Sequence, residues 1–160
     1  MLEEPLNRKM IVAILLLLLG QATVHEAFSQ GGSPMDLNGY RWKNRLLMVF
    51  SPSPDDPNYQ SLNKEMQDQR DALRDRDILV FEIFAKGPSR LDNSPMPKDS
   101  VDFLRKKFSA GQGLFLAILI GKDGEEKIRR QKVSLTEIFA VIDGMPMRQR
   151  EMKERVKNQQ

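Results

Sequence analysis

Cysteine is absent from this 160-residue sequence, and histidine occurs once, at His25. Without a thiol the chain can form no disulfide, thiolate zinc site, iron-sulfur cluster or cysteine nucleophile. Excess charge is also scarce, because 25 Lys and Arg stand against 22 Asp and Glu, a net charge of +3. So small an excess gives no reason to expect a nucleic-acid partner. The length and the 40% hydrophobic content are those of one globular domain.

Long apolar runs are rare too, and the longest lies at the start of the chain. Arg8 and Lys9 precede the apolar segment 10–19, and small and polar residues follow from Gly20 to Gln30. This order is typical of a secretory signal. A membrane-spanning helix needs about 20 apolar residues, roughly twice this run. We therefore predict a signal peptide over residues 1–29 and an exported protein, periplasmic or secreted, with no membrane span after cleavage; an uncleaved anchor is the alternative.

The cleavage site has two candidates. Ala27 and Ser29 place small residues where a signal peptidase reads them, which favours cleavage before Gln30, and cleavage after Ala22 competes. Removing residues 1–29 takes away two bases, three acids and His25, leaving 23 bases and 19 acids. A mature chain without Cys or His cannot build a Ser-His-Asp or Cys-His triad or a histidine metal site. We expect no metal and no cofactor, and we favour a role other than catalysis.

The mature chain divides into a flexible lead-in (30–38), a domain (39–147) and a basic tail (148–160). Short apolar runs and an Asp-Gly turn predict four strands, at 45–50, 78–84, 114–120 and 126–130. Helical spacing of apolar residues predicts three helices, at 59–76, 101–108 and 134–142. The order is β-α-β-α-β-β-α, with a parallel crossover followed by an antiparallel hairpin. This order predicts an α/β, thioredoxin-like fold with a mixed four-stranded sheet and flanking helices.

Local signals set the ends of two helices. Asp56 followed by Pro57 predicts a side-chain cap and a proline in the first helical position. Ser134 and Glu137 have the spacing of a capping box. Gly144 is expected to end the last helix in the left-handed conformation.

Three other features have structural interpretations. The segment 122–124 (Lys-Asp-Gly) is interpreted as a hairpin turn, not as a binding site. Trp42, the only tryptophan, is expected to pack with Tyr40 as a lid on the edge of the sheet, a ligand platform being the alternative. Met145 and Met147 are expected to pack against the domain and not to bind metal.

Several segments resemble a known family. They are Arg41-Trp42-Lys43-Asn44-Arg45, the loop 51–57, the segment 119–124 and Ile142-Asp143-Gly144-Met145-Pro146-Met147-Arg148. Together they resemble the peroxiredoxin-like DUDES family, a thioredoxin-fold group of unknown function, over residues 37–152. Its members include stand-alone bacterial proteins and domains of sushi-repeat-containing and related extracellular matrix proteins. The resemblance implies a secreted location and a fold, and it supplies no established activity.

The loop after the first strand is where a thioredoxin-like fold holds its reactive thiols. In this chain the corresponding residues are Ser51, Pro52, Ser53, Asp55 and Asp56. A helix dipole contributes about 0.3 to 1 kcal/mol, far too little to ionise a serine hydroxyl without a base. The adjacent aspartates could form an acid/base pair or bind a cation, but carboxylates at a helix start are more often caps.

We therefore predict a non-catalytic binding module for a protein or an envelope component, acting through the loop 51–56 and the neighbouring loop 85–98. One alternative is a cysteine-independent oxidoreductase or peroxidase. Another is a tail that tethers the domain to anionic envelope polymers or lipid head groups, as opposed to a merely solvated tail. The tail residues concerned are Arg148, Arg150, Lys153, Arg155 and Lys157.

Overall fold

The structure is a computed structural model that describes residues 35–158. The predicted signal peptide and both cleavage sites lie outside this range. The strands are β1 (Arg45–Ser51), β2 (Ile78–Phe84), β3 (Arg90–Leu91), β4 (Ser94–Pro95), β5 (Leu116–Ile120) and β6 (Glu126–Arg130). The helices are the 3-10 turn η1 (Leu37–Tyr40), α2 (Pro57–Asp68), α3 (Arg70–Asp75), α4 (Lys98–Lys107), α5 (Leu135–Asp143) and α6 (Pro146–Lys157).

The strands form one open mixed sheet in the order β4-β3-β2-β1-β5-β6. β1 pairs in parallel with β2 and antiparallel with β5, and β6 returns antiparallel beside β5. β1 is central, and all seven of its residues are buried, as expected of a strand covered on both faces. The mixed α/β class, the parallel crossover and the antiparallel hairpin are confirmed.

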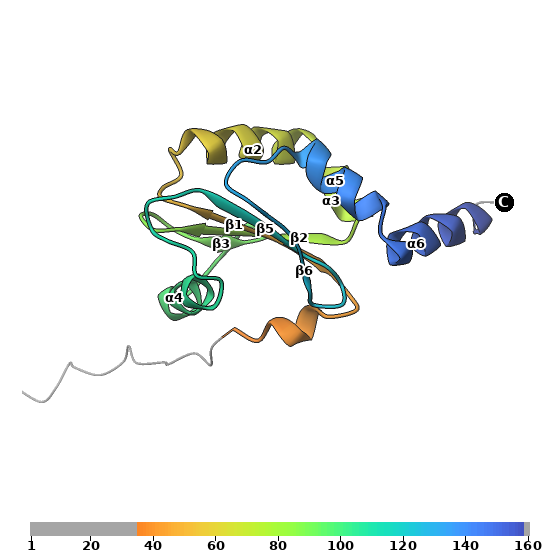
Figure 1. Cartoon of the computed structure of the whole chain (residues 1–160), viewed down its shortest axis with the longest axis horizontal. Coiled ribbons are helices and arrows are strands. Elements are labelled where there is room, and N and C mark those ends of the chain that lie inside the picture. Colours follow the sequence, from red (N-terminus) through yellow and green to blue (C-terminus); the bar gives the residue numbers. More distant parts are fainter. Residues whose placement is uncertain (1–34, 159–160) are drawn as a thin grey trace, which may run out of the picture. The chain divides into compact units, whose positions relative to one another are not determined.

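Two apolar clusters cover the two faces of the sheet. Leu47 and Val49 of β1 belong to the cluster shared with α2, α3 and α5, whereas Leu46, Met48 and Phe50 belong to the cluster shared with α4. The alternation follows from the two-residue period of a strand. Figure 1 shows α2, α3 and α5 over one face and α4 over the other.

The sheet has six strands in the described range, so the expected four are incomplete. The extra pair, β3 and β4, lies in the segment interpreted as a polar loop. Asp92 and Asn93 join these strands with φ values of 44° and 72°. Positive φ at both central positions is the requirement of a tight hairpin, and Asp and Asn tolerate it. Strands of two residues are too short to show an alternating pattern in the sequence.

The helix expected over residues 59–76 is divided in two. Gln69 leaves the helical conformation with φ −122° and ψ 35°, so α2 ends at Asp68 and α3 begins at Arg70. Buried Met66 and Leu73 lie on either side of the break. Gln69 and Arg70 are polar, so the apolar stripe of the helix is interrupted at the break.

The predicted Asp56 cap is confirmed, the capping box of Ser134 and Glu137 is found in part, and the left-handed end at Gly144 is wrong. The Asp56 carboxylate caps α2, with Pro57 in the first turn, and the Ser134 hydroxyl accepts from the backbone N–H of Glu137. The Glu137 carboxylate pairs with Arg130 at 3.3 Å. Gly144 is not left-handed: its φ is −78°. Helix α6 begins two residues later, so the chain does not reverse at Gly144, and this residue stays in the right-handed helical region.

Candidate functional site

The predicted binding loop, residues 51–56, lies between the end of β1 and the start of α2 (Figure 1). Ser51 is fully buried, and its Oγ donates to the carbonyl of Ser53 at 3.0 Å. The Ser53 Oγ in turn accepts from the backbone N–H of Asp55 at 3.2 Å. Both hydroxyls therefore hold the loop in shape, and the Ser51 hydroxyl is not open to a substrate.

The two aspartates of the loop have different surroundings. One carboxylate oxygen of Asp56 accepts the backbone N–H groups of Asn58 and Tyr59, each at 3.0 Å, which is the geometry of a helix cap. Asp55 is exposed. Its carboxylate caps no helix, and its backbone N–H donates to the Ser53 Oγ.

A buried arginine supports the loop from α4. The guanidinium of Arg105 donates through Nη2 to the carbonyls of Ser51 and Ile83, both at 2.9 Å, and through Nη1 to the carbonyl of Gly111 at 3.1 Å. Burial lowers the pKa of Arg105. Carbonyl dipoles thus replace water around a cation, and they join the ends of β1 and β2 to α4.

A second polar cluster lies on the face of the sheet that α2, α3 and α5 cover, and the sequence did not predict it. The hydroxyl of Tyr59 donates to the Glu82 carboxylate, and Arg90 Nε lies 3.2 Å from Glu82 Oε2. Burial and the hydrogen bond to Glu82 raise the pKa of Tyr59 to about 12. The signal available in the sequence was a single carboxylate inside the otherwise apolar strand 78–84.

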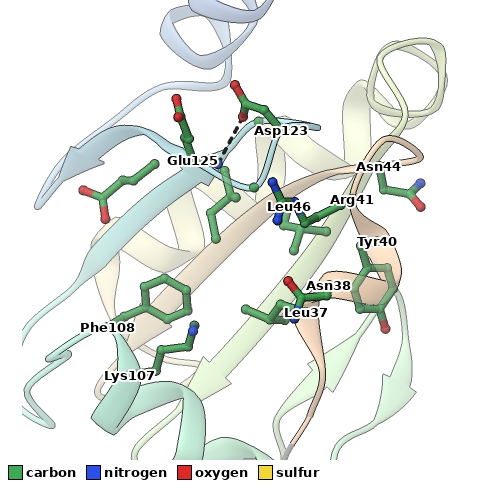
Figure 2. Close-up of a pocket in the computed structure, with 14 residues that line it drawn as sticks. Leu37, Asn38, Tyr40, Arg41, Asn44, Leu46, Lys107, Phe108, Asp123 and Glu125 are labelled. Carbon is green, nitrogen blue, oxygen red and sulfur yellow. Dashed lines mark hydrogen bonds between the residues drawn. The ribbon is translucent and has the colours of Figure 1, made fainter.

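The other face of the sheet carries a cleft of about 330 Å³ between η1, the end of α4 and the β5–β6 turn. In Figure 2, Leu37 and Phe108 form apolar parts of its wall, while Asp123 and Glu125 lie at the turn. Asp123 Oδ1 accepts the backbone N–H of Glu125 at 3.1 Å, and Oδ2 bonds Lys127 at 2.6 Å. The segment 122–124 is thereby confirmed as a hairpin turn, with Gly124 at φ +83°.

Trp42 does not form the expected lid. Its side chain is 63% exposed, and its φ is 64°. The backbone N–H of Trp42 donates to the carbonyl of Lys122 at 2.7 Å, which holds the residue in the left-handed region beside the hairpin turn. The ring of Tyr40 instead packs edge-on against the ring of Phe81, with 5.9 Å between the ring centroids.

The basic residues of the tail lie on α6, where they fall into two groups. Arg148 is 3% exposed, bonds the Asp75 carboxylate and carbonyl, and lies 3.4 Å from Asp143. Arg155 also pairs with Asp75. The remaining three are exposed, and they are Arg150, Lys153 and Lys157.

A buried ion-pair network fixes α6 to the first residue of β1. Arg45, 1% exposed, bonds both carboxylate oxygens of Glu151 at 3.2 Å, and Lys122 bonds Glu151 at 2.8 Å. Burial alone would raise the pKa of Glu151, but Lys122 and Arg45 outweigh it, and the pKa is lowered. Arg45, Asp143 and Arg148 lie in the segments that resemble a known family, and each of them makes structural contacts.

Within residues 35–158 no group of three or more Asp or Glu side chains is arranged to hold a metal ion, and this range contains no Cys or His. None of its helices has the length and apolar content to span a membrane.

These features define a mixed α/β domain whose candidate loop carries serine and aspartate and no thiol. A family model described as "Domain of unknown function (DUF4174)" matches residues 36–151, and the chain belongs to this family. The chain is similar to "Sushi repeat-containing protein SRPX2" of Xenopus laevis, with 29% identity over 116 residues. That match covers 70% of this chain and 25% of the relative, so the chain spans about a quarter of the relative's length. No solved structure matches the chain significantly. Similarity to a sushi-repeat protein and membership in a family of unknown function are thus confirmed.

Proposed function

We propose that the protein is an exported, non-catalytic binding domain with a thioredoxin-like fold. Its loop 51–56 contacts a protein or another component of the cell envelope. The observation that carries the proposal is the hydrogen bonding of this loop. Both serine hydroxyls and the Asp56 carboxylate bond within the loop or to the start of α2. Export is supported by the signal-like segment 1–29.

The loop has the properties of a rigid recognition surface. The carbonyls of Ser51 and Pro52 accept from the backbone N–H groups of Ala85 and Lys86, at 3.0 and 2.9 Å respectively. The guanidinium of Arg105 donates to the Ser51 carbonyl as well. A loop held in one conformation loses little entropy on binding, which favours affinity. Exposed Asp55 supplies a charged contact with a basic partner.

An enzyme that works without cysteine is the competing function. Nucleophilic catalysis by Ser51 requires a base within hydrogen-bond reach of the hydroxyl, at about 2.6 to 3.2 Å. The hydroxyl donates instead to the Ser53 carbonyl, an acceptor that cannot take up its proton at neutral pH. The direct test is turnover of hydrogen peroxide or a disulfide substrate by the purified, metal-free protein. We expect none, and turnover would overturn the proposal.

Affinity capture from the cell envelope tests the binding role. Asp55→Arg reverses one exposed charge of the loop, and Asp68→Arg makes the same change at the far end of α2, where it is the matched control. We expect the Asp55→Arg variant to lose a saturable partner that the wild type and the control both retain. Equal capture by all three proteins would remove the loop from the proposal.

A second function is favoured by the exposed bases Arg150, Lys153 and Lys157 on α6. They could hold the domain on anionic envelope polymers through contacts that salt weakens. Replacing all three by Gln tests this tether and leaves Arg148 and Glu151 in place. The tether requires that retention on the envelope then fall at low salt. Unchanged retention would exclude it.

A further inference from the structure

Glu82 interrupts an apolar row of the sheet. Alternate residues of β2 face the layer of α2, α3 and α5, and Ile78, Val80 and Phe84 pack in the apolar cluster on that face. Glu82 lies between Val80 and Phe84 in this row and is 7% exposed. A buried carboxylate destabilises the fold unless partners compensate it. A residue that breaks the pattern of its own strand at this cost points to a function.

The contacts with Glu82 and Tyr59 leave part of the Arg90 guanidinium without a hydrogen bond. Tyr59 and Arg90 both bond the carboxylate, and the Arg90 Nη2 lies 3.4 Å from both Glu82 Oε1 and the Tyr59 hydroxyl. The Arg90 side chain is 42% exposed. Its Nη1 makes no hydrogen bond to any of residues 35–158. Glu82 thus orients Arg90, whose side chain stays partly exposed to solvent.

Arg90 also lines a pocket of about 280 Å³ between α2, α3, β2 and the β3–β4 turn. The polar lining has three arginines, two carboxylates and three side-chain amides: Arg70, Arg74, Arg90, Glu82, Asp92, Asn63, Gln67 and Asn93. The lining therefore has one excess positive charge. Within residues 35–158 Arg70 has no ion pair, and Arg74 pairs only with exposed Asp71 at 3.6 Å, a contact of little energy.

We propose that this pocket binds a small ligand through one oxyanionic group, a carboxylate, sulfate or phosphate, held by Arg90 and Arg70. Guanidinium groups match such oxygens with paired, charge-assisted hydrogen bonds. The amides of Asn63, Gln67 and Asn93 supply donors and acceptors for the polar body of the ligand. None of residues 51–56 lines this pocket, so the site is independent of the proposed binding loop.

NMR titration of the purified exported protein tests the site. The probes are sulfate, phosphate and glucuronate, with glucose as the uncharged control. We expect saturable shifts of the amide signals of the pocket residues with at least one of the anions and none with glucose. The anion that saturates at the lowest concentration identifies the chemical group. Shifts that never saturate, shifts spread over all exposed bases, or no shifts at all would each refute the site.

Two variants define the roles of individual residues. Arg70→Gln should weaken the binding about tenfold, the value of one charge-assisted bond, whereas Lys64→Gln removes an exposed charge of α2 outside the pocket and should change nothing. Equal weakening by the Arg70 and Lys64 variants would contradict the assignment. Thermal melting of each variant separates these results from loss of the fold.

Discussion

The two ends of β1 compensate a buried guanidinium in opposite ways. At the first residue, Arg45 is 1% exposed and meets the carboxylate of Glu151 from α6. At the last residue, the carbonyl of Ser51 accepts from Arg105, which is 8% exposed and bonds only carbonyls. The first end joins a separate helix to the sheet by charge, and the second fixes a loop by dipoles. The first end is a structural contact, and the second is the loop to which the proposed function assigns binding.

The largest effect is expected at the ion-paired end. Arg148→Ala removes the buried guanidinium from Asp75 and Asp143, which are partly exposed and keep Arg76 and Arg155 as partners. We therefore expect a loss of about 3 kcal/mol, the lower end of the range for a broken buried ion pair. Arg150→Ala, on the exposed side of the same helix, should change the free energy of unfolding by less than about 0.5 kcal/mol. Urea denaturation of both variants measures the difference. A similar, small loss in both would show that α6 does not stabilise the domain.

A smaller loss is expected at the loop end. Arg105→Met removes the donor from the carbonyls of Ser51 and Ile83, and an unsatisfied buried group costs about 1–3 kcal/mol. Hydrogen exchange of the Ala85 amide, which bonds the Ser51 carbonyl, should also become faster. Lys106→Met, exposed on the same helix, is the control. Unchanged exchange at Ala85 would mean that Arg105 does not fix the loop.

Acid should weaken the ion-paired end selectively. Burial raises the pKa of Asp143, but bonds from Arg76 and Arg148 outweigh burial, so its pKa is lowered, as is that of Glu151. A carboxyl group with a lowered folded pKa stabilises the fold above its unfolded pKa of about 4. The stabilisation is lost as the pH falls through the folded value. Melting temperatures between pH 7 and pH 2 should therefore fall at the acid end, and less steeply in the Asp143→Asn, Glu151→Gln double variant. Parallel curves would contradict this linkage.

The smallest effect is expected at the helix cap of the loop. Asp56→Ala removes the acceptor of two backbone N–H groups and should cost about 1 kcal/mol. Asp55→Ala removes an exposed carboxylate that caps nothing and should cost almost no stability. Thermal melting of the two variants compares adjacent, chemically identical residues. Equal losses would show that the cap is not formed in solution.

Local patterns predicted the parts of the fold that depend on neighbours in the sequence. The strands at 78–84 and 126–130 and the Asp56 cap are found where expected, since apolar runs, an Asp-Gly turn and a cap–proline pair are local signals. The role of Arg148 could not be predicted this way. Its partner Asp75 lies 73 residues earlier in the chain, and only the packing of α6 brings the two together.

The candidate site shows the same limit. The bonds of Ser53 and Asp56 are local, but Arg105 reaches Ser51 across 54 residues, and Tyr59 reaches Glu82 across 23. A carboxylate in an apolar strand was visible in the sequence. Its partners were not, because Arg90 lies in a two-residue strand that no pattern predicts.

Photo-crosslinking in exporting cells tests the contrast between the two ends most directly. A crosslinking side chain placed at position 55, on the loop, is compared with one at position 153, on the exposed side of α6. We expect one discrete crosslinked partner from position 55, absent when Ser53 and Pro54 are also replaced, and none from position 153. A discrete partner from position 153 alone would contradict the assignment of binding to the loop end.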